Sequence, residues 1–481
     1  MRKKTAYRPS EPHRRYVTRR DGSRVINDAH VGPSRQPGGR TSSNFADIIG
    51  THDVDREIER LYGDDAIPYE VNVPASVENV LGDLYDIGNP LIIGGSVRDS
   101  IAGIDSKDID IEVHGTDIDS LTSHLASRGY HVDEVGKQFG VLKARKGRVA
   151  DLDISVPHRE NRTGAGHRSF DVVTDSDMTL REAVERRDFT FNALMYDHRR
   201  KVMIDTAGGK DDFEEGLMRY VSDKFAEDPL RVLRGFQFAA RFGMRYDPET
   251  AEFARGLRGE YNTLPAERVQ DEWNKFFTKG RYFSEGFSAL RESGWDDTQP
   301  GLRAVAADPV TGDDLQRLGE LPPGERTVQG AAYLAYRIDE QCTDGNMSDG
   351  SRLIGNTVAG KKNQRAARDL AALTLDDVDS DENIRKTALR LSKAGVTMAD
   401  ASKAFFVRGL ADGVTGAQRA EELGVSAEPE PDWITGDDVL SATDRKPGRW
   451  VGEVLNDMRD KQYSRRVSSR DEALAELKRS V

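Results

Sequence analysis

The chain is poor in cysteine and lacks long apolar runs. Its single cysteine among 481 residues, Cys342, excludes an intramolecular disulfide framework and a cysteine-rich zinc site, which favours a cytoplasmic protein. No apolar run reaches the roughly 18 residues of a membrane-spanning helix, so we expect a soluble protein without a membrane partner. Histidine is absent after His198, which excludes a histidine-ligated metal site in the remainder of the sequence.

The charge balance is acidic, with a formal net charge of −13. This balance disfavours nucleic-acid binding over the whole surface, because phosphate contacts need positive charge, but one basic face can exist on an acidic protein. The segment Met1–Arg40 is rich in arginine, has no apolar stretch like that of a secretory signal, and is interrupted by Pro and Gly. We interpret it as a flexible basic arm, either a nucleic-acid contact or a solvated tail.

Apolar periodicity divides the chain into a mixed N-terminal part and a helical C-terminal part. The N-terminal part alternates expected helices and strands, which indicates a mixed β-sheet that carries helices. From Phe225 onward helical spacing dominates, and two stretches rich in helix breakers, Thr298–Glu325 and Ser426–Trp433, divide this part. The expected N-terminal elements are the helices Val77–Leu84 and Ser120–Tyr130 and the strands Leu91–Ile93, Asp108–Val113, Phe139–Arg145 and Val149–Val156.

The expected strand Asp108–Val113 carries an acidic residue at every second position. Side chains alternate between the two faces of a strand, so Asp108, Asp110 and Glu112 should share one open face. Two carboxylates about 6.6 Å apart are suited to Mg²⁺, including a pair of ions. A solvent-facing edge strand is the alternative interpretation, since acids are common there.

A glycine pair precedes this strand. Gly94, Gly95 and Ser96 follow an apolar strand and open an expected helix, where N–H groups can bind phosphate and glycine permits a close approach. Arg98 lies one turn into that helix and could reach the same anion. A glycine pair alone indicates only a turn, but together with the acids that follow it favours one pocket for phosphates and metals.

Two further groups of polar residues could serve this pocket. Asp153, on the expected strand Val149–Val156, is a plausible third metal ligand if that strand pairs beside the acidic one, and otherwise a surface acid. Arg187 could bind a triphosphate while Asp188 and Asn192 supply fixed hydrogen bonds. A capped core helix is the alternative for this second group.

A polar stripe lies at the start of the helical part. Pro229 favours the opening of a helix, and Asp228, Arg231 and Arg234 occur at three-residue steps, which places them on one face. Surface ion pairing is the usual interpretation of such a stripe.

Together these segments resemble the tRNA nucleotidyltransferase and bacterial poly(A) polymerase family, the class II branch of the polymerase-β-like nucleotidyltransferases. The resemblance covers about residues 73–295 and rests on motifs in the family's order and spacing. The motifs are IGGSVRD (Ile93–Asp99), DIDI (Asp108–Ile111), the strand around Asp153, RRDFTFNAL (Arg186–Leu194), IDTAGGKDD (Ile204–Asp212), EDPLRVLR (Glu227–Arg234), AARFG (Ala239–Gly243), PAERVQDEW (Pro265–Trp273) and GFSALRESG (Gly286–Gly294).

The resemblance implies roles for the matching residues of the N-terminal part. Asp108 and Asp110 would hold Mg²⁺, with two ions expected, and Asp153 would be the third catalytic acid. Triphosphate and sugar binding is implied above all for Gly95, Arg98 and Arg187. The expected nucleotide-binding set in this part of the chain consists of Gly94, Gly95, Ser96, Arg98, Arg187, Asp188 and Asn192.

For the polar stripe, the resemblance implies recognition of the nucleotide base. Asp228 and Arg231 would hydrogen-bond the base, and Arg234 would help to hold the nucleotide. An arginine that donates and a carboxylate that accepts can match the Watson–Crick edge of C or A without a template. The family often continues with a further arginine where this chain has Gln237, which implies weaker triphosphate binding or another cation.

The fold implied by the resemblance is an α/β nucleotidyltransferase head followed by all-α domains. Its parts are a basic arm, linker and acidic extension (1–72), a catalytic head (73–210), a helical neck with the nucleotide-selecting motif (211–295), a helical body (296–425) and a helical tail (426–481). Body and tail would bind the tRNA elbow. Many bacterial relatives append an HD-type phosphohydrolase domain, but the absence of histidine after His198 excludes an active HD site here.

The activity implied is addition of CMP and AMP to the 3′ end of tRNA, with CTP and ATP as substrates. The segment Gly136–Ala144 lacks the arginine-rich stretch of the poly(A) branch and is closer to the CCA-adding type. Alternatives are a poly(A) polymerase, an enzyme that adds only A or only CC, and a non-catalytic RNA-binding protein on the same scaffold. The loop Glu160–Phe170 is expected to contribute to this choice.

Overall fold

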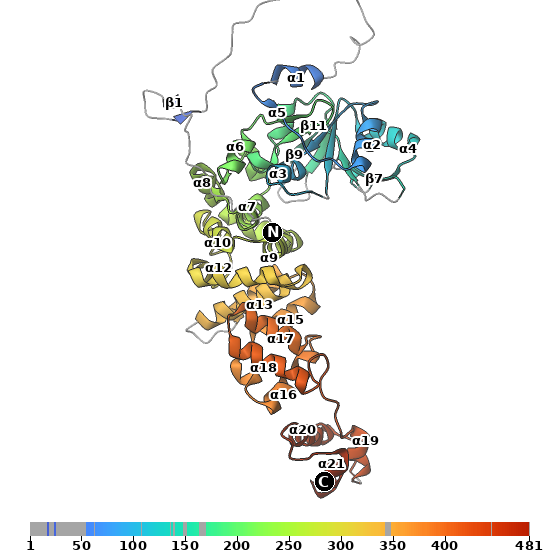
Figure 1. The fold of residues 1–481 in the computed structure, drawn as a ribbon, viewed down its shortest axis with the longest axis vertical. Coiled ribbons are helices and arrows are strands. Elements are labelled where there is room, and N and C mark those ends of the chain that lie inside the picture. Colours follow the sequence, from blue (N-terminus) through green and yellow to red (C-terminus); the bar gives the residue numbers. More distant parts are fainter. Residues whose placement is uncertain are drawn as a thin grey trace, which may run out of the picture. The chain divides into compact units, whose positions relative to one another are not determined.

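The computed structural model describes residues 17–18, 24–25 and 54–480, apart from 62, 107, 135, 138–139, 148–151, 163–169, 342–347 and 444. Its chain divides into two units, Met1–Asp228 and Pro229–Val481, here called the head unit and the helical unit (Figure 1). Most of the predicted basic arm, the centre of the predicted loop Glu160–Phe170 and Cys342 lie outside the described residues.

The head unit is built on a mixed β-sheet, as predicted. In its described residues the sheet has eight strands in the order β3-β12-β11-β4-β5-β8-β7-β6, and every neighbouring pair is antiparallel except β5 and β8. The strands are β3 (Ala66–Pro68), β4 (Asn89–Ile93), β5 (Asp110–His114), β6 (His131–Asp133), β7 (Val141–Arg145), β8 (Leu152–Ser155), β11 (Met195–Asp197) and β12 (Val202–Ile204).

Further strand pairs and helices complete the head unit. Two further antiparallel pairs are β1 (Val17–Thr18) with β2 (Arg24–Val25) and β9 (His158–Arg162) with β10 (Phe170–Thr174). The other elements are α1 (Val54–Leu61), α2 (Ala75–Leu84), α3 (Gly95–Ile101), α4 (Ile118–Ser127), α5 (Leu180–Val184), the 3₁₀ helix η3 (Thr190–Asn192), α6 (Gly209–Glu214), β13 (Leu217–Met218) and η4 (Asp223–Glu227).

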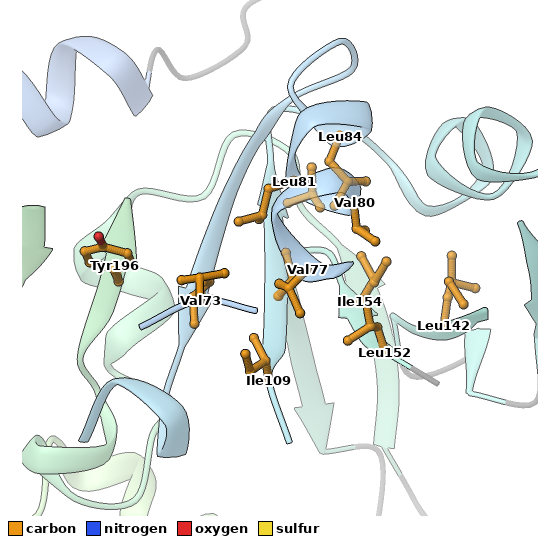
Figure 2. Close-up of a cluster of buried hydrophobic side chains, with 14 of the residues drawn as sticks. Val73, Val77, Val80, Leu81, Leu84, Ile109, Leu142, Leu152, Ile154 and Tyr196 are labelled. Atoms are coloured by element: carbon orange, nitrogen blue, oxygen red, sulfur yellow. The ribbon is translucent and has the colours of Figure 1, made fainter. Parts of the chain in front are cut away.

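Helices cover both faces of the central sheet, which explains the nearly continuous apolar sequence of β4. On one face Ile92 is buried with Leu81 of α2 (Figure 2). On the other face Leu91 is buried with Leu180 of α5. Full burial of a leucine side chain contributes about 1.5–3 kcal/mol to the stability of the fold. Packing on both faces therefore stabilises β4 in its position beside β5.

The described residues of the helical unit are almost entirely helical, in agreement with the all-α prediction. The first elements are α7 (Leu230–Phe242), β14 (Arg245–Tyr246), α8 (Pro248–Gly256), η5 (Arg258–Thr263), α9 (Ala266–Lys279), α10 (Phe283–Glu292), α11 (Leu302–Ala307), α12 (Pro309–Leu315) and η6 (Gln316–Glu320). The later elements are α13 (Pro323–Gln341), α14 (Ser348–Thr357), α15 (Lys361–Ala371), η7 (Leu375–Val378), α16 (Asp381–Ser392), α17 (Met398–Val407), α18 (Ala411–Glu422), α19 (Gly436–Ser441), α20 (Arg449–Tyr463) and α21 (Arg470–Ser480).

The stretch Thr298–Glu325 corrects one prediction, because the expected break contains helices α11 and α12. Asp308 and Pro309 start a helix instead of ending one. Asp308 caps α12 by accepting a hydrogen bond from the Val310 N–H, at 3.0 Å, and Pro309 occupies the first helical position, where no N–H is needed.

The last three helices form a small group with a hydrophobic cluster of their own. Between α18 and α19 the described residues contain no helix, as expected for Ser426–Trp433. Helices α19, α20 and α21 share a separate hydrophobic cluster that includes Val439, Met458 and Leu477. No helix in the described part of the chain is long and apolar enough to cross a membrane.

Candidate active site

The sheet register brings the glycine turn and the acidic strand to the same edge. Ile93, the last residue of β4, lies opposite Asp110, the first residue of β5. Gly94 follows Ile93 directly, so the turn begins beside Asp110. The parallel pairing of β5 with β8 places Asp153 opposite Asp110, which meets the condition set for Asp153 from the sequence.

The turn between β4 and α3 requires a glycine. Gly94 has φ +68° and ψ −122°, a backbone conformation that residues with a Cβ rarely adopt. Its N–H donates to the Leu194 carbonyl at 2.9 Å, and its own carbonyl accepts from the Arg98 N–H at 3.1 Å. Ser96 is buried beneath the turn and donates to the Ile93 carbonyl at 3.4 Å. The turn is therefore fixed by its own hydrogen bonds.

Arg98 lies beneath this turn, inside the protein. Its side chain is buried, and the guanidinium donates to Asp99 Oδ1 through Nε at 2.9 Å and Nη2 at 2.6 Å. A further bond runs from its Nη1 to Asn192 Oδ1, and Asn192 Nδ2 donates to Asp188 Oδ1 at 3.0 Å. The structure thus joins three predicted residues, Arg98, Asp188 and Asn192, in one buried network, together with Asp99, which the sequence interpretation missed.

Asp108 and Asp110 both keep exposed side chains at the edge of the sheet. Asp108 precedes the first residue of β5, so the strand is shorter at this end than predicted. Partial exclusion of water by the surrounding protein and the charge of Asp153 raise the pKa of Asp110, while Arg187 opposes both effects. The pKa of Asp110 is therefore raised in spite of the nearby cation.

Asp153 has a basic partner of its own. The ammonium of Lys143, on the neighbouring strand β7, lies 2.8 Å from Asp153 Oδ1. In the described residues no three His, Cys, Asp or Glu side chains converge as a metal-ligand group. The predicted roles of Asp108, Asp110 and Asp153 as ligands stay predictions.

Glu112 corrects the prediction of an open acidic face. It lies on the same face of β5 as Asp110, but it is 2% exposed, because other side chains of the head, His114 and Arg187 among them, surround it. Its Oε1 lies 3.1 Å from His114 Nε2, and its Oε2 lies 3.5 Å from Arg187 Nη2. Burial alone would raise the pKa of Glu112, but the hydrogen bond to His114 and the charge of Arg187 lower it to about 2.

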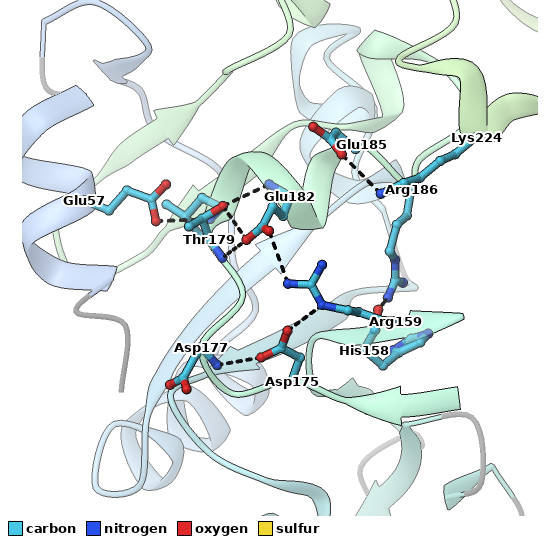
Figure 3. Close-up of polar contacts among 11 residues, drawn as sticks. Glu57, His158, Arg159, Asp175, Asp177, Thr179, Glu182, Glu185, Arg186 and Lys224 are labelled. Atoms are coloured by element: carbon cyan, nitrogen blue, oxygen red, sulfur yellow. Dashed lines mark hydrogen bonds and ion pairs between the residues drawn. The ribbon is translucent and has the colours of Figure 1, made fainter. Parts of the chain in front are cut away.

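Arg187 connects this buried acid to the exposed edge. Its side chain is 27% exposed and its charge acts on both Glu112 and Asp110. The neighbouring residues are anchored, since Arg186 donates to the His158 carbonyl and Glu185 pairs with Lys224 at 3.1 Å (Figure 3). The backbone of Arg187 is therefore held by the two anchored residues that precede it and by its own N–H, which donates to the Val184 carbonyl at 2.9 Å.

The predicted polar stripe lies where the head unit ends and the helical unit begins. Asp228 is the last residue of the head unit, and Arg231 and Arg234 lie on α7 with partly exposed side chains. Arg234 Nη1 lies 4.0 Å from Glu272 Oε1 of α9. Gln237 does not continue the stripe, because it is buried, with its Oε1 lacking a hydrogen-bond partner.

One family model matches part of the head unit. Residues 91–219 match the model of the poly(A) polymerase head domain. The matched residues of that head domain contain the glycine turn, the acidic edge of β5 and β8, and the network of Arg98 with Asn192.

Curated relatives extend the likeness over part of the chain. A multifunctional CCA protein of Aliivibrio salmonicida is 36% identical over 208 residues, which cover 42% of this chain and 48% of the relative. A multifunctional CCA protein of Xylella fastidiosa (strain 9a5c) is 37% identical over 189 residues, 38% of this chain and 43% of the relative. The match thus spans about half the length of these relatives.

Solved structures extend the likeness beyond the poly(A) polymerase head domain. The Bacillus stearothermophilus CCA-adding enzyme in complex with CTP has 19% identity and a TM-score of 0.62, with 85% of this chain and 98% of that chain covered. The Thermotoga maritima CCA-adding enzyme complexed with tRNA has 17% identity and a TM-score of 0.52, with 89% and 98% covered. At this identity the likeness establishes the fold, a mixed-sheet head followed by helical domains, which confirms the predicted fold class.

Proposed function

We propose that this protein is a cytoplasmic tRNA nucleotidyltransferase that adds CMP and AMP to the 3′ end of tRNA without a template. The observation that carries the proposal is the register of β4 and β5, in which the residue before the glycine turn lies opposite Asp110. In this proposal the backbone that binds phosphate and the acids that bind the metal lie at the same edge of the sheet. The CCA-adding relatives support the choice of tRNA, CTP and ATP as partners.

The acids at this edge fit magnesium in their chemistry. Asp108 and Asp110 provide carboxylate oxygens, which Mg²⁺ prefers, and both are exposed. The raised pKa of Asp110 supports a place for a cation beside it. When bound, Mg²⁺ lowers the pKa of a ribose hydroxyl and neutralises phosphate charge, and the proposal includes two ions. Asp153, which pairs with Lys143 in the structure, is the third acid of the proposed site.

The reaction needs no protein nucleophile. The 3′-oxygen of the tRNA end forms a bond to the α-phosphorus of the nucleotide, the bond to the bridging oxygen breaks, and pyrophosphate leaves. The hydroxyl proton passes to solvent. The chain's own residues hold the reactants in line, which is the main source of catalysis in phosphoryl transfer.

Each group of residues has one task in this proposal. Arg187 and the turn at Gly94 and Gly95 bind the triphosphate, and Arg98 supports that turn from below through its network. Asp228 and Arg231 select the base, with Arg234 beside them. The helical body and tail bind the tRNA elbow.

The test is nucleotide addition to tRNA lacking its 3′-terminal CCA. Purified full-length protein is incubated with this RNA, Mg²⁺ and each labelled nucleoside triphosphate, separately and together, and the products are sequenced. We expect two C residues from CTP and one further A from ATP. Long A tracts would identify a poly(A) polymerase, and addition of only C or only A would identify a partial enzyme. Binding of tRNA without any addition would overturn the enzymatic proposal.

A further inference from the structure

Three alternate residues of β5 form a line that runs from the exposed edge of the sheet into its interior. Asp110 is exposed, whereas Glu112 and His114 are buried, with 2% and 0% exposure. An ionised carboxylate is costly to bury without partners, so Glu112 requires an explanation. Catalytic acids of the proposed metal site lie at the edge, and Glu112 is too deep to be one of them.

Glu112 contacts a buried histidine with one carboxylate oxygen and a partly exposed arginine with the other. Its Oε1 meets His114 Nε2, and its Oε2 faces Arg187 Nη2 at 3.5 Å. His114 lies deeper in the protein, and its other ring nitrogen, Nδ1, is buried without a hydrogen-bond partner. Arg187 is the member of this group that retains contact with solvent. Glu112 therefore links a buried histidine to the exposed arginine.

We propose that Glu112 is a positioning residue that holds the Arg187 guanidinium in place to receive the nucleotide triphosphate. The inference rests on the proposed function, in which Arg187 binds that triphosphate. The backbone around Arg187 is anchored by Arg186 and Glu185, which leaves the direction of its long side chain to be fixed. Glu112 fixes that direction from inside the protein.

The charge of Arg187 acts on two acids. Arg187 also acts on Asp110, which the proposed function assigns to the metal. The carboxylate of Glu112, 3.5 Å from Arg187 Nη2, is the acid that forms an ion pair with the guanidinium. Loss of its negative charge would remove the attraction that holds Arg187 in place. This is a role of the carboxylate charge as well as of its shape.

The first experiment compares Glu112→Gln with the unchanged full-length protein. Glutamine keeps the size of the side chain and removes its charge. We expect the Kd for ATP and the KM for ATP with tRNA ending in CC to rise about tenfold, and kcat to change by less than about threefold. Glu112→Asp, which keeps the charge, should restore at least half of the lost affinity on a logarithmic scale.

A matched control separates positioning from general damage. Asp197 is another buried acid of the same sheet, 2% exposed, and it pairs with Arg200 at 2.7 Å. Asp197→Asn removes the same kind of charge from the same kind of pair, so it should lower thermal stability without raising the Kd for ATP. An equal rise in Kd for both variants would overturn the positioning role.

A double-mutant cycle then tests whether Glu112 acts through Arg187. In an Arg187→Gln background, Glu112→Gln should change the Kd for ATP by less than about twofold, because the group that it positions is gone. Additive effects of the two changes would overturn the inference. Equilibrium binding of ATP does not need turnover. A protein that binds ATP but adds no nucleotide would contradict the proposed function, and the role of Glu112 in ATP binding could still be measured.

Discussion

Asp110 and Glu112 lie two positions apart on one face of β5, yet the first is exposed and the second is buried. At the scale of single residues, the sequence could predict that both acids share a face, because that follows from strand geometry. It could not predict which of these positions the rest of the head covers. The burial of Glu112 depends on residues from other parts of the chain, such as Arg187.

Removal of the Asp110 carboxylate should separate activity from stability. Because the side chain is exposed and repelled by Asp153, we expect Asp110→Ala to leave the free energy of unfolding within about 0.5 kcal/mol of its original value. Nucleotide addition should fall by more than about 100-fold. Removal of a metal ligand should reduce activity more than removal of a carboxylate that only supports such a ligand. Urea unfolding and primer-extension rates measure the two.

The control for this variant is Asp105→Ala, which removes an exposed acid a few residues upstream that accepts a hydrogen bond from Asn72. It should keep full activity. Appreciable Mg²⁺-dependent addition by Asp110→Ala would contradict the metal assignment.

Gly94 offers a second test at this scale. Its φ of +68° places Gly94→Ala in a strained conformation, with a cost of about 1–3 kcal/mol in the free energy of unfolding. Gly82→Ala is the matched control, because Gly82 lies inside α2 with open space where a Cβ would stand, and alanine should stabilise that helix by up to about 1 kcal/mol. Urea titration of both variants measures the change in the free energy of unfolding. Changes of the same sign in the two variants would contradict the strain at Gly94.

At the scale of elements, strong patterns predicted the structure well and short ones did not. The helices around Val77–Leu84 and Ser120–Tyr130 were predicted correctly because their apolar spacing is regular. Strands β3, β11 and β12 have three residues each, too few for an alternating pattern to stand out. The network of Arg98 with Asp99 and Asn192 joins helix α3 to the 3₁₀ helix η3, and no local pattern indicates such a contact.

Helix α5 provides a prediction about pH. Its capping box pairs Thr179 with Glu182, and Arg159 reaches the same carboxylate (Figure 3). The Thr179 backbone N–H, its hydroxyl and Arg159 lower the pKa of Glu182 from 4.5 to about 2. A lowered pKa in the folded state adds stability above about pH 4.5, and this stability is lost as the pH falls toward 2.

Glu182→Gln should therefore reduce the free energy of unfolding at pH 7 by about 0.5–1 kcal/mol, a modest amount because the side chain is 38% exposed. The difference between the two proteins should shrink as the pH falls from 4.5 to 2. Urea unfolding at pH 7 and pH 3 measures it, with Glu214→Gln, a surface acid of α6 paired with Lys210, as the control. An equal difference at both pH values would contradict the linkage.

At the scale of the whole molecule, the proposed chemistry and the proposed choice of nucleotide lie in different parts of the chain. The acids and the glycine turn belong to the head unit, whereas the nucleotide-choosing residues begin at Asp228, the last residue of that unit, and continue with Arg231 and Arg234 of the helical unit. The family motifs predicted both groups, because each is local in sequence. Burial of Gln237 was not predictable from the stripe alone, since it depends on the helices packed around α7.

This division predicts that nucleotide choice can be damaged without loss of chemistry. Asp228→Ala or Arg231→Ala should remove about 1–3 kcal/mol of discrimination, the usual value of a good base contact, while kcat for the preferred nucleotide falls less. The measurement is the ratio of kcat/KM for CTP and ATP to that for GTP and UTP. Arg255→Ala, on α8, is the control. Unchanged ratios in both stripe variants would mean that the base is read elsewhere.

The pairing of β3 with β12 has a consequence for synthesis of the protein. Ala66 of β3, near the start of the described head, pairs with Ile204 of β12, close to its end, so β3 leaves the ribosome early and has no partner in the sheet until β12 has been made. Such a strand can pair with other chains while it waits. Slowing translation after β12 should therefore do little harm to folding, whereas slowing it before β12 should increase aggregation of the nascent head.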